Sequence, residues 1–308
     1  MATPKSQNSA PAAFVPPPTS TPLPQINPYT NSKAFIEMVS ILYHAEKAAL
    51  DAFERLTDES VVEDCEVFLR ARPMLLADEA AHLRDMENII RLVGGTGIGP
   101  APVGFAELWD LQRARERLVF PLPSEAAALF TLVAESVGYA YLYHLATATS
   151  SPEIAALLWD NVEDERYHIE VSMEVLDRTL SRKGALFDLG LHLCAFLLLS
   201  RRAARTMVAS LATLRFNPYE LAASSLAFTT GVLGTVIEKK FGGAMRRAYV
   251  QRAGRLAFSP LMIRAYHTTS YLPEPPFVWP VLRGCVRLNR LASGRSRAGS
   301  GKQPGRPA

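Results

Sequence analysis

The pattern Asp-Glu-x-x-His occurs twice in the chain, at residues 78–82 and again at residues 164–168. Each copy lies in a stretch whose apolar residues recur with the period of an α-helix, and its Glu and His fall on the apolar stripe. Residues three apart share one helix face, so the Glu and His side chains can reach the same point. A carboxylate oxygen with an imidazole nitrogen suits a transition metal. We therefore expect a fold in which two helices bring both pairs together around metal.

Two further glutamates lie in helical stretches where a charge is out of place. Glu46 falls inside the apolar stripe of residues 31–56, and Glu135 is the only formally charged residue between Glu125 and Glu153. A carboxylate buried alone is very costly, so each needs an ion partner, a proton or a metal. Four carboxylates and two histidines from four helices are the ligand set of bundle-type di-iron or di-manganese sites. Buried ion pairs are the alternative, but none of the four stripes carries Lys or Arg.

Four helical stretches predict an all-α fold based on a four-helix bundle. They run over about residues 31–56, from the turn at 57–60 to about 93, over 124–148, and from 152 to about 180. Pro73 predicts a kink or break within the second stretch. Ser151, Pro152 and Glu153 form a start signal for the fourth, because proline is favoured at the first position of a helix.

The segments outside residues 31–180 differ from the bundle in composition. Residues 1–30 are rich in proline with few apolar anchors, which predicts a disordered extension. Residues 181–272 predict a helical C-terminal extension that packs on the bundle. Residues 273–308 are Pro/Gly-rich and basic, and we expect a largely disordered tail.

Cysteine usage and the N-terminal composition bear on the compartment. The three cysteines, Cys65, Cys194 and Cys285, are far apart and odd in number, which argues against a disulfide framework. Residues 1–30 lack the basic-then-apolar order of a secretion signal. No uninterrupted apolar run reaches the ~20 residues that span a bilayer. We therefore expect a cytoplasmic protein.

The combination of Glu46, Glu79-x-x-His82, Glu135 and Glu165-x-x-His168 resembles the ferritin-like di-iron carboxylate superfamily. The doubled Asp-Glu-x-x-His is more similar to ribonucleotide reductase small subunits, multicomponent monooxygenase hydroxylases and p-aminobenzoate N-oxygenase-type enzymes than to ferritin. The resemblance covers residues 31–180 and implies a ferritin-like four-helix bundle with a helical C-terminal extension. The chain departs from the N-oxygenase pattern at Asn161, where that group has a further histidine.

The resemblance also implies a role for each matched ligand. Glu46 from the first helix and Glu135 from the third would each bind a metal. Glu79 and Glu165 would bridge the two metals. His82 and His168 would bind one metal each.

Two aspartates and two tyrosines are candidates for supporting roles. Asp78 and Asp164 each precede a bridging glutamate, where a carboxylate can accept the outer ring N–H of a ligating histidine. The alternative is that both are ordinary solvated aspartates. Tyr139 and Tyr43, within about one helical turn of a ligand, are candidates for a redox role or for simple packing.

The function implied by the resemblance is that of a non-haem di-iron oxygenase or oxidase. Two iron ions, Fe2+ or Fe3+, would use O2 and an external electron donor to hydroxylate, N-oxygenate or desaturate a small organic substrate. Manganese suits the same oxygen and nitrogen donors. A ferritin- or rubrerythrin-like ferroxidase or peroxidase, and a dimanganese catalase, are the alternatives. A tRNA hydroxylase ranks below both.

The uneven charge bears on substrate and partners. The net charge of +3 divides into −12 over residues 1–188 and +15 over residues 189–308, since the latter hold 18 basic and three acidic residues. A basic half can meet an anionic or carrier-bound substrate or the face of an anionic membrane, or it can be merely solvated. Nucleic acid is disfavoured, because no aromatic residues are interleaved with the basic ones. A homodimer is compatible with the sequence.

Overall fold

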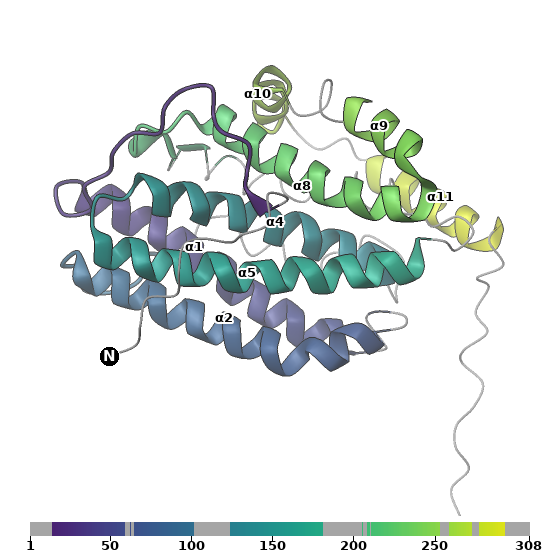
Figure 1. The fold of residues 1–308 in the computed structure, drawn as a ribbon, viewed down its shortest axis with the longest axis horizontal. Coiled ribbons are helices and arrows are strands. Elements are labelled where there is room, and N and C mark those ends of the chain that lie inside the picture. The colour runs from purple at the N-terminus through teal and green to yellow at the C-terminus, as the bar shows by residue number, and fades with distance from the viewer. Residues whose placement is uncertain are drawn as a thin grey trace, which may run out of the picture.

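The computed structural model describes residues 14–58, 62, 65–101, 124–180, 205, 208–209, 211–252, 259–272 and 277–292. These residues form an all-α structure with four long helices side by side (Figure 1). The four are α1 (Ser32–Leu56), α2 (Glu66–Leu92), α4 (Ser124–Ala148) and α5 (Pro152–Thr179). The predicted all-α four-helix bundle is therefore confirmed.

Two helical hairpins make the bundle, with α1 packed on α2 and α4 packed on α5. Helix α2 also packs on α5, which joins the hairpins across the centre. In α1 the apolar positions that recur with the helical period, such as Phe35, Val39, Leu42 and Phe53, are all buried. Helix α4 is buried almost all round, as its apolar composition predicts. The cores of both hairpins therefore meet in the middle of the bundle.

Helix α2 continues through Pro73, where the sequence predicted a kink or break. Pro73 and Leu69, four residues before it, are both exposed. A proline frees the carbonyl four residues earlier, and at an exposed position water can bind that carbonyl instead. The helix therefore remains continuous up to the residues of the first motif.

Residues 14–30, predicted as part of a disordered extension, instead lie along the bundle. The Ile26 N–H donates to the Ala148 carbonyl at 2.8 Å, and the Ser150 N–H donates to the Ile26 carbonyl at 2.8 Å. Ile26 is only 3% exposed, and the Phe14 ring packs against Phe228. The prediction was wrong here because these few apolar side chains and backbone groups find partners at the α4–α5 turn and on α8.

Helix α8 (Pro218–Phe241) packs on the outer side of α4, and three shorter helices follow it. These are α9 (Gly243–Arg252), α10 (Pro260–Thr269) and α11 (Val278–Ala292). Helix α11 corrects the prediction of a largely disordered tail over 273–308, because its Trp279 and Val286 are spaced for one helix face and are buried. The predictions for residues 1–13, 181–204 and 293–308 lie outside the described residues.

Helices α4 and α8 are each long and apolar enough to cross a bilayer by length and composition. The sequence had indicated no such stretch, because Glu135 and the polar residues of both helices interrupt the apolar runs. Most of the apolar window of each helix is buried inside the protein. Packing against other helices therefore accounts for the apolar character of both.

Candidate metal centre

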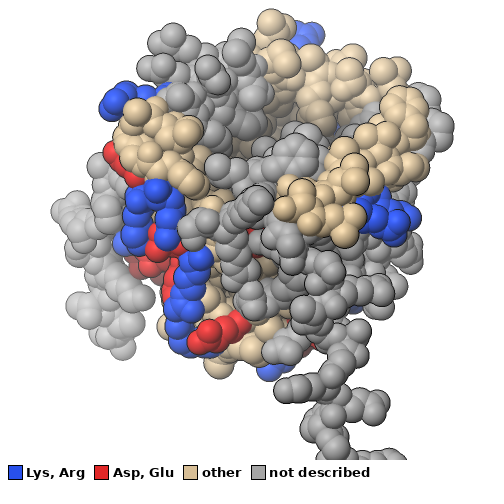
Figure 2. Space-filling view, turned by 90° about the vertical axis from the view of Figure 1, so that its right-hand side faces the viewer, with Lys and Arg blue, Asp and Glu red and all other residues tan. Residues whose placement is uncertain are grey.

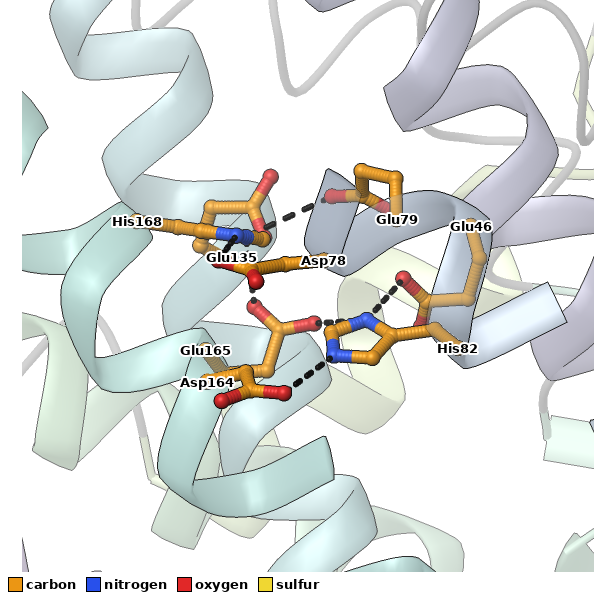
Figure 3. Close-up of polar contacts among 8 residues, drawn as sticks. All are labelled: Glu46, Asp78, Glu79, His82, Glu135, Asp164, Glu165 and His168. Atoms are coloured by element: carbon orange, nitrogen blue, oxygen red, sulfur yellow. Dashed lines mark hydrogen bonds and ion pairs between the residues drawn. The ribbon is translucent and has the colours of Figure 1, made fainter. Parts of the chain in front are cut away.

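All six predicted ligands meet in the middle of the bundle. Each is at most 4% exposed, and they come from four helices (Figure 3). Their donor atoms fall into two groups, each with all atoms within 4.8 Å of one another: Glu46, His82 and Glu165 in one, and Glu79, Glu135 and His168 in the other. Each group thus has two carboxylates and one imidazole drawn from three helices.

The motif spacing explains why α2 and α5 each serve both groups. Glu79 and His82 stand three apart on one face of α2, yet they belong to different groups. The same holds for Glu165 and His168 on α5. Helices α2 and α5 therefore each supply one residue to each group, so the packing of α2 on α5 positions both groups.

Glu165 lies between the two histidines (Figure 3). Its Oε1 is 3.7 Å from Nδ1 of His82, and its Oε2 is 3.6 Å from Nδ1 of His168. The two ring centroids are 5.9 Å apart. One carboxylate with an oxygen turned toward each group has the arrangement of a bridging ligand.

The remaining short contacts join each histidine to the glutamates of its own group. Nδ1 of His82 is 3.4 Å from Oε2 of Glu46. Nδ1 of His168 is 3.3 Å from Oε1 of Glu79 and 3.5 Å from Oε2 of Glu135. Both imidazoles thus turn the same nitrogen, Nδ1, toward the glutamate carboxylates.

The two aspartates contact the outer nitrogens of the histidines in a crossed manner. Nε2 of His82 on α2 is 3.7 Å from Oδ2 of Asp164 on α5. Nε2 of His168 on α5 is 3.5 Å from Oδ2 of Asp78 on α2. Each motif therefore supplies the aspartate that faces the histidine of the other motif. In a neutral imidazole, an Nε2–H that faces a carboxylate leaves Nδ1 as the nitrogen that can bind a metal.

Burial and crowding shift the pKa values of two glutamates upward. Burial raises the pKa of Glu79 well above the usual carboxyl range, and the charge of Glu46 raises it further. Burial likewise raises the pKa of Glu165, with a further rise from Glu135. Burial also acts to raise the pKa of Glu46, but the contact with His82 outweighs it and the pKa is lowered. Without a cation, burial and the neighbouring carboxylates therefore favour the protonated forms of Glu79 and Glu165.

The pKa values of both histidines are also raised, but by the neighbouring carboxylates and against the effect of burial. Burial alone would lower the pKa of His82, but the nearby carboxylates of Asp164 and Glu46 raise it to about 10. Burial also acts to lower the pKa of His168, and contacts with Asp78, Glu135 and Glu165 raise it well above the usual value. The carboxylates therefore attract positive charge to the space between them, and in the metal-free protein protons supply it.

Several donor atoms of the cluster are buried without a hydrogen-bond partner. They are both oxygens of Glu79, Oε1 of Glu135, Oε2 of Glu165, Nδ1 of His168 and the Nε2 atoms of His82 and His168. A buried polar atom without a partner costs roughly 1–3 kcal/mol, and more when it is charged. Within the described parts of the chain, no Lys or Arg forms an ion pair with any of the six ligands. The donor set therefore fits metal ions better than buried ion pairs.

The tyrosine candidates lie apart from these contacts. The hydroxyl of Tyr139 donates to the Phe14 carbonyl at 2.5 Å, and its ring stacks on Phe228 with centroids 4.9 Å apart. Burial raises the pKa of Tyr139 to about 12. Tyr43 is half-buried and packs edge-on against His44. Tyr139 thus faces the N-terminal segment and α8, and its observed contacts are those of a packing residue.

Three buried polar residues on α4 and α5 were not among the predicted site residues. Asn161 on α5 is 1% exposed, and neither its amide nitrogen nor its oxygen has a hydrogen-bond partner. Ser136 and Ser172 are fully buried with unpartnered hydroxyls. Asn161 is one turn before Glu165 and Ser172 one turn after His168, so helical spacing along the stripe is the signal that could have found them.

No known protein-family model matches the sequence, and no curated protein shows significant similarity to it. The fold and the site nevertheless define a class. The protein is a helical bundle with two buried clusters of two glutamates and one histidine each, an arrangement typical of di-iron bundles.

Proposed function

We propose that the two clusters bind two iron ions and that the protein is a non-haem di-iron oxygenase of the ferritin-like superfamily. The observation that carries this proposal is the position of Glu165, with one oxygen toward each histidine. A carboxylate shared by two groups favours a pair of neighbouring metals over two independent sites. The unpartnered buried donor atoms give further support.

Charge balance favours two divalent cations. With its histidines neutral, the site has four carboxylates and a charge of −4, which two divalent cations cancel. A single divalent cation would leave two buried negative charges, which is costly without protons to neutralise them. Oxygen and nitrogen donors suit iron and manganese alike, so the metal must be identified by experiment.

The side chains of the site have distinct tasks in this proposal. Glu46 and Glu135 would each bind one metal, and Glu79 and Glu165 would bridge the pair. Asp78 and Asp164 would hold the outer N–H groups of the histidines and so fix the orientation of both rings. The irons, when bound, supply electrons and open coordination positions for the reduction of O2.

The surrounding structure fits chemistry that must be kept from bulk water. All six ligands are buried under the packed faces of α1, α2, α4 and α5. The helices α8 to α11 add structure beyond a four-helix bundle, which supports a protein that accepts an organic substrate rather than one that only stores metal. Hydroxylation, N-oxygenation and desaturation of that substrate all need the same ligands.

The test is the metal content per chain after anaerobic loading with Fe2+, followed by the optical spectrum on mixing with O2. We expect about two irons per chain and a transient visible absorption. Glu165→Gln should lose most of the metal. Glu163→Gln makes the same chemical change at an exposed position on the same helix and should retain it. Equal loss in both variants, or no stoichiometric metal in the wild type, would refute the proposal.

Two manganese ions with rapid breakdown of hydrogen peroxide would instead identify a dimanganese catalase. Iron that is oxidised and accumulates well beyond two per chain would identify a ferroxidase. Both results would retain the binuclear site but reject the oxygenase.

A further inference from the structure

Helix α11 and Phe277, the residue just before it, present a line of large apolar side chains to solvent. Phe277, Val281, Leu288 and Leu291 are 64%, 55%, 67% and 65% exposed. Their spacing of four, seven and three residues places them on one helix face. Single exposed apolar residues are ordinary, but a contiguous apolar surface marks a site of contact with a protein or a membrane.

The opposite face of α11 is buried. Trp279 and Val286, seven residues apart, are only 8% and 1% exposed. The helix therefore has two apolar faces, one already packed and one free to contact something else. Because the inner face fixes the helix, the outward line is a stable feature of the surface.

The charge of the three C-terminal helices is basic. Helices α9, α10 and α11 contain Arg but no Asp or Glu. Residues 239–308 hold 14 Lys and Arg against the single acid Glu274. Arg287 is exposed one turn before Leu291, so a guanidinium lies beside the apolar line.

Figure 1 shows α9 and α11 at the same end of the molecule, near the C-terminal ends of α5 and α8. Figure 2 faces that end and shows uncharged surface in tan, with blue Lys and Arg atoms at its edges and red Asp and Glu atoms beside some of them. Some of the basic groups there are paired, since Lys239 contacts Asp177 and Arg246 contacts Glu238. No acid within α11 balances the arginines of that helix.

Two occupants from the protein itself fit this surface poorly. The remaining C-terminal residues, 293–308, contain no large apolar side chain and add four more basic residues, so they offer nothing to cover the line. A second copy of α11 would bring arginines against arginines with no acid to separate them, and like charges across an interface are costly.

We propose that α11 is an interfacial helix that binds the surface of a membrane containing anionic phospholipids. An apolar face flanked by basic residues is the pattern of helices that lie in the plane of the membrane interface. The four apolar side chains would enter the boundary between headgroups and acyl chains. Arg287 would contact a phosphate, while its apolar stem follows the same boundary. This inference is independent of the metal site.

The experiment is co-sedimentation of the full-length protein with vesicles of two compositions. One is phosphatidylcholine alone, and the other is equal parts of phosphatidylcholine and phosphatidylserine. We expect sedimentation with the anionic vesicles only, and weaker binding as salt is raised. Failure to bind the anionic vesicles at low salt, or equal binding to both compositions, would overturn the proposal.

Matched variants test whether α11 is the contact. Leu288→Ser/Leu291→Ser removes two exposed side chains and should weaken binding roughly tenfold or more. Arg287→Glu should weaken binding to the anionic vesicles. Leu69→Ser/Met74→Ser removes two exposed apolar side chains on α2 and should leave binding unchanged.

Two results with these variants would also overturn the proposal. One is that the α11 variant binds the vesicles as well as the wild type does. The other is a lipid-free dimer, seen by sedimentation equilibrium, that the α11 variant converts to a monomer, because a second copy would then be the occupant. Unchanged circular dichroism will establish that each variant is folded.

Discussion

Metal binding should release protons from the site, and the structure gives the scale of this effect. The pKa of His82 is about 10 in the metal-free protein, so at pH 7 the ring is protonated. A ligating imidazole must be neutral, so a metal has to displace that proton. Removing it at pH 7 costs about 4 kcal/mol, from about 3 pKa units at about 1.4 kcal/mol each.

Three more groups should contribute protons in the same way. The pKa values of His168, Glu79 and Glu165 are also raised in the metal-free protein. Metal binding near pH 7 should therefore release the proton of His82, and the raised pKa values of the other three groups act in the same direction. The sign is fixed: the metal-free state holds the protons, so metal affinity rises with pH up to the pKa of His82, which is about 10.

The assay is anaerobic titration calorimetry with Mn2+, which avoids oxidation, in two buffers of similar pKa but different heats of ionisation. The difference in measured heat gives the number of protons released per chain. Repeating the titration between pH 6 and 8 should show affinity rising roughly tenfold per pH unit for each proton released. Release of less than one proton per chain, with a pH-independent affinity, would show that the histidines are not ligands and refute the account of the site.

Three further predictions concern single residues. Burial lowers the pKa of His144 to about 4. The unfolded ring takes up a proton near its usual pKa and the folded ring does not. The free energy of unfolding therefore decreases as the pH is lowered. Between pH 8 and 5 the metal-free wild type should lose about 2 kcal/mol more than His144→Gln does in urea unfolding, and equal losses would contradict this. Asn161→Leu should raise the unfolding free energy of the metal-free protein by about 1 kcal/mol or more, because both amide atoms are buried without partners. A loss of stability would mean that the amide has a partner. Asp164→Asn should weaken metal binding about 10- to 100-fold by releasing the outer nitrogen of His82, whereas Asp160→Asn, exposed one turn earlier, should have little effect in the same calorimetric titration.

The helices and the convergence of the site follow from local patterns in the sequence. The period of apolar residues locates α1, α4 and α5 closely, and Pro152 marks the start of α5. The six candidate ligands could be singled out because four carboxylates lie on apolar stripes and the motif is repeated. A charge on a buried face is a strong signal, since it must be compensated.

The features that sequence could not predict depend on contacts between distant segments. Asp78 and Asp164 were placed near histidines, but only the packing of α2 on α5 shows that each faces the histidine of the other motif. The segment around Ile26 has no periodic pattern, and its order rests on backbone hydrogen bonds to residues 148 and 150. Asn161 differs from many surface amides only in its burial, which the sequence of α5 does not reveal.

Anomalous X-ray diffraction from crystals loaded anaerobically with Fe2+, recorded at the iron edge, would locate each metal relative to its ligands. We expect two iron ions per chain, one in each group of two glutamates and a histidine, both in contact with Glu165. A single ion, ions bound only at surface carboxylates, or protonated glutamates and histidines with no metal between them would contradict this expectation.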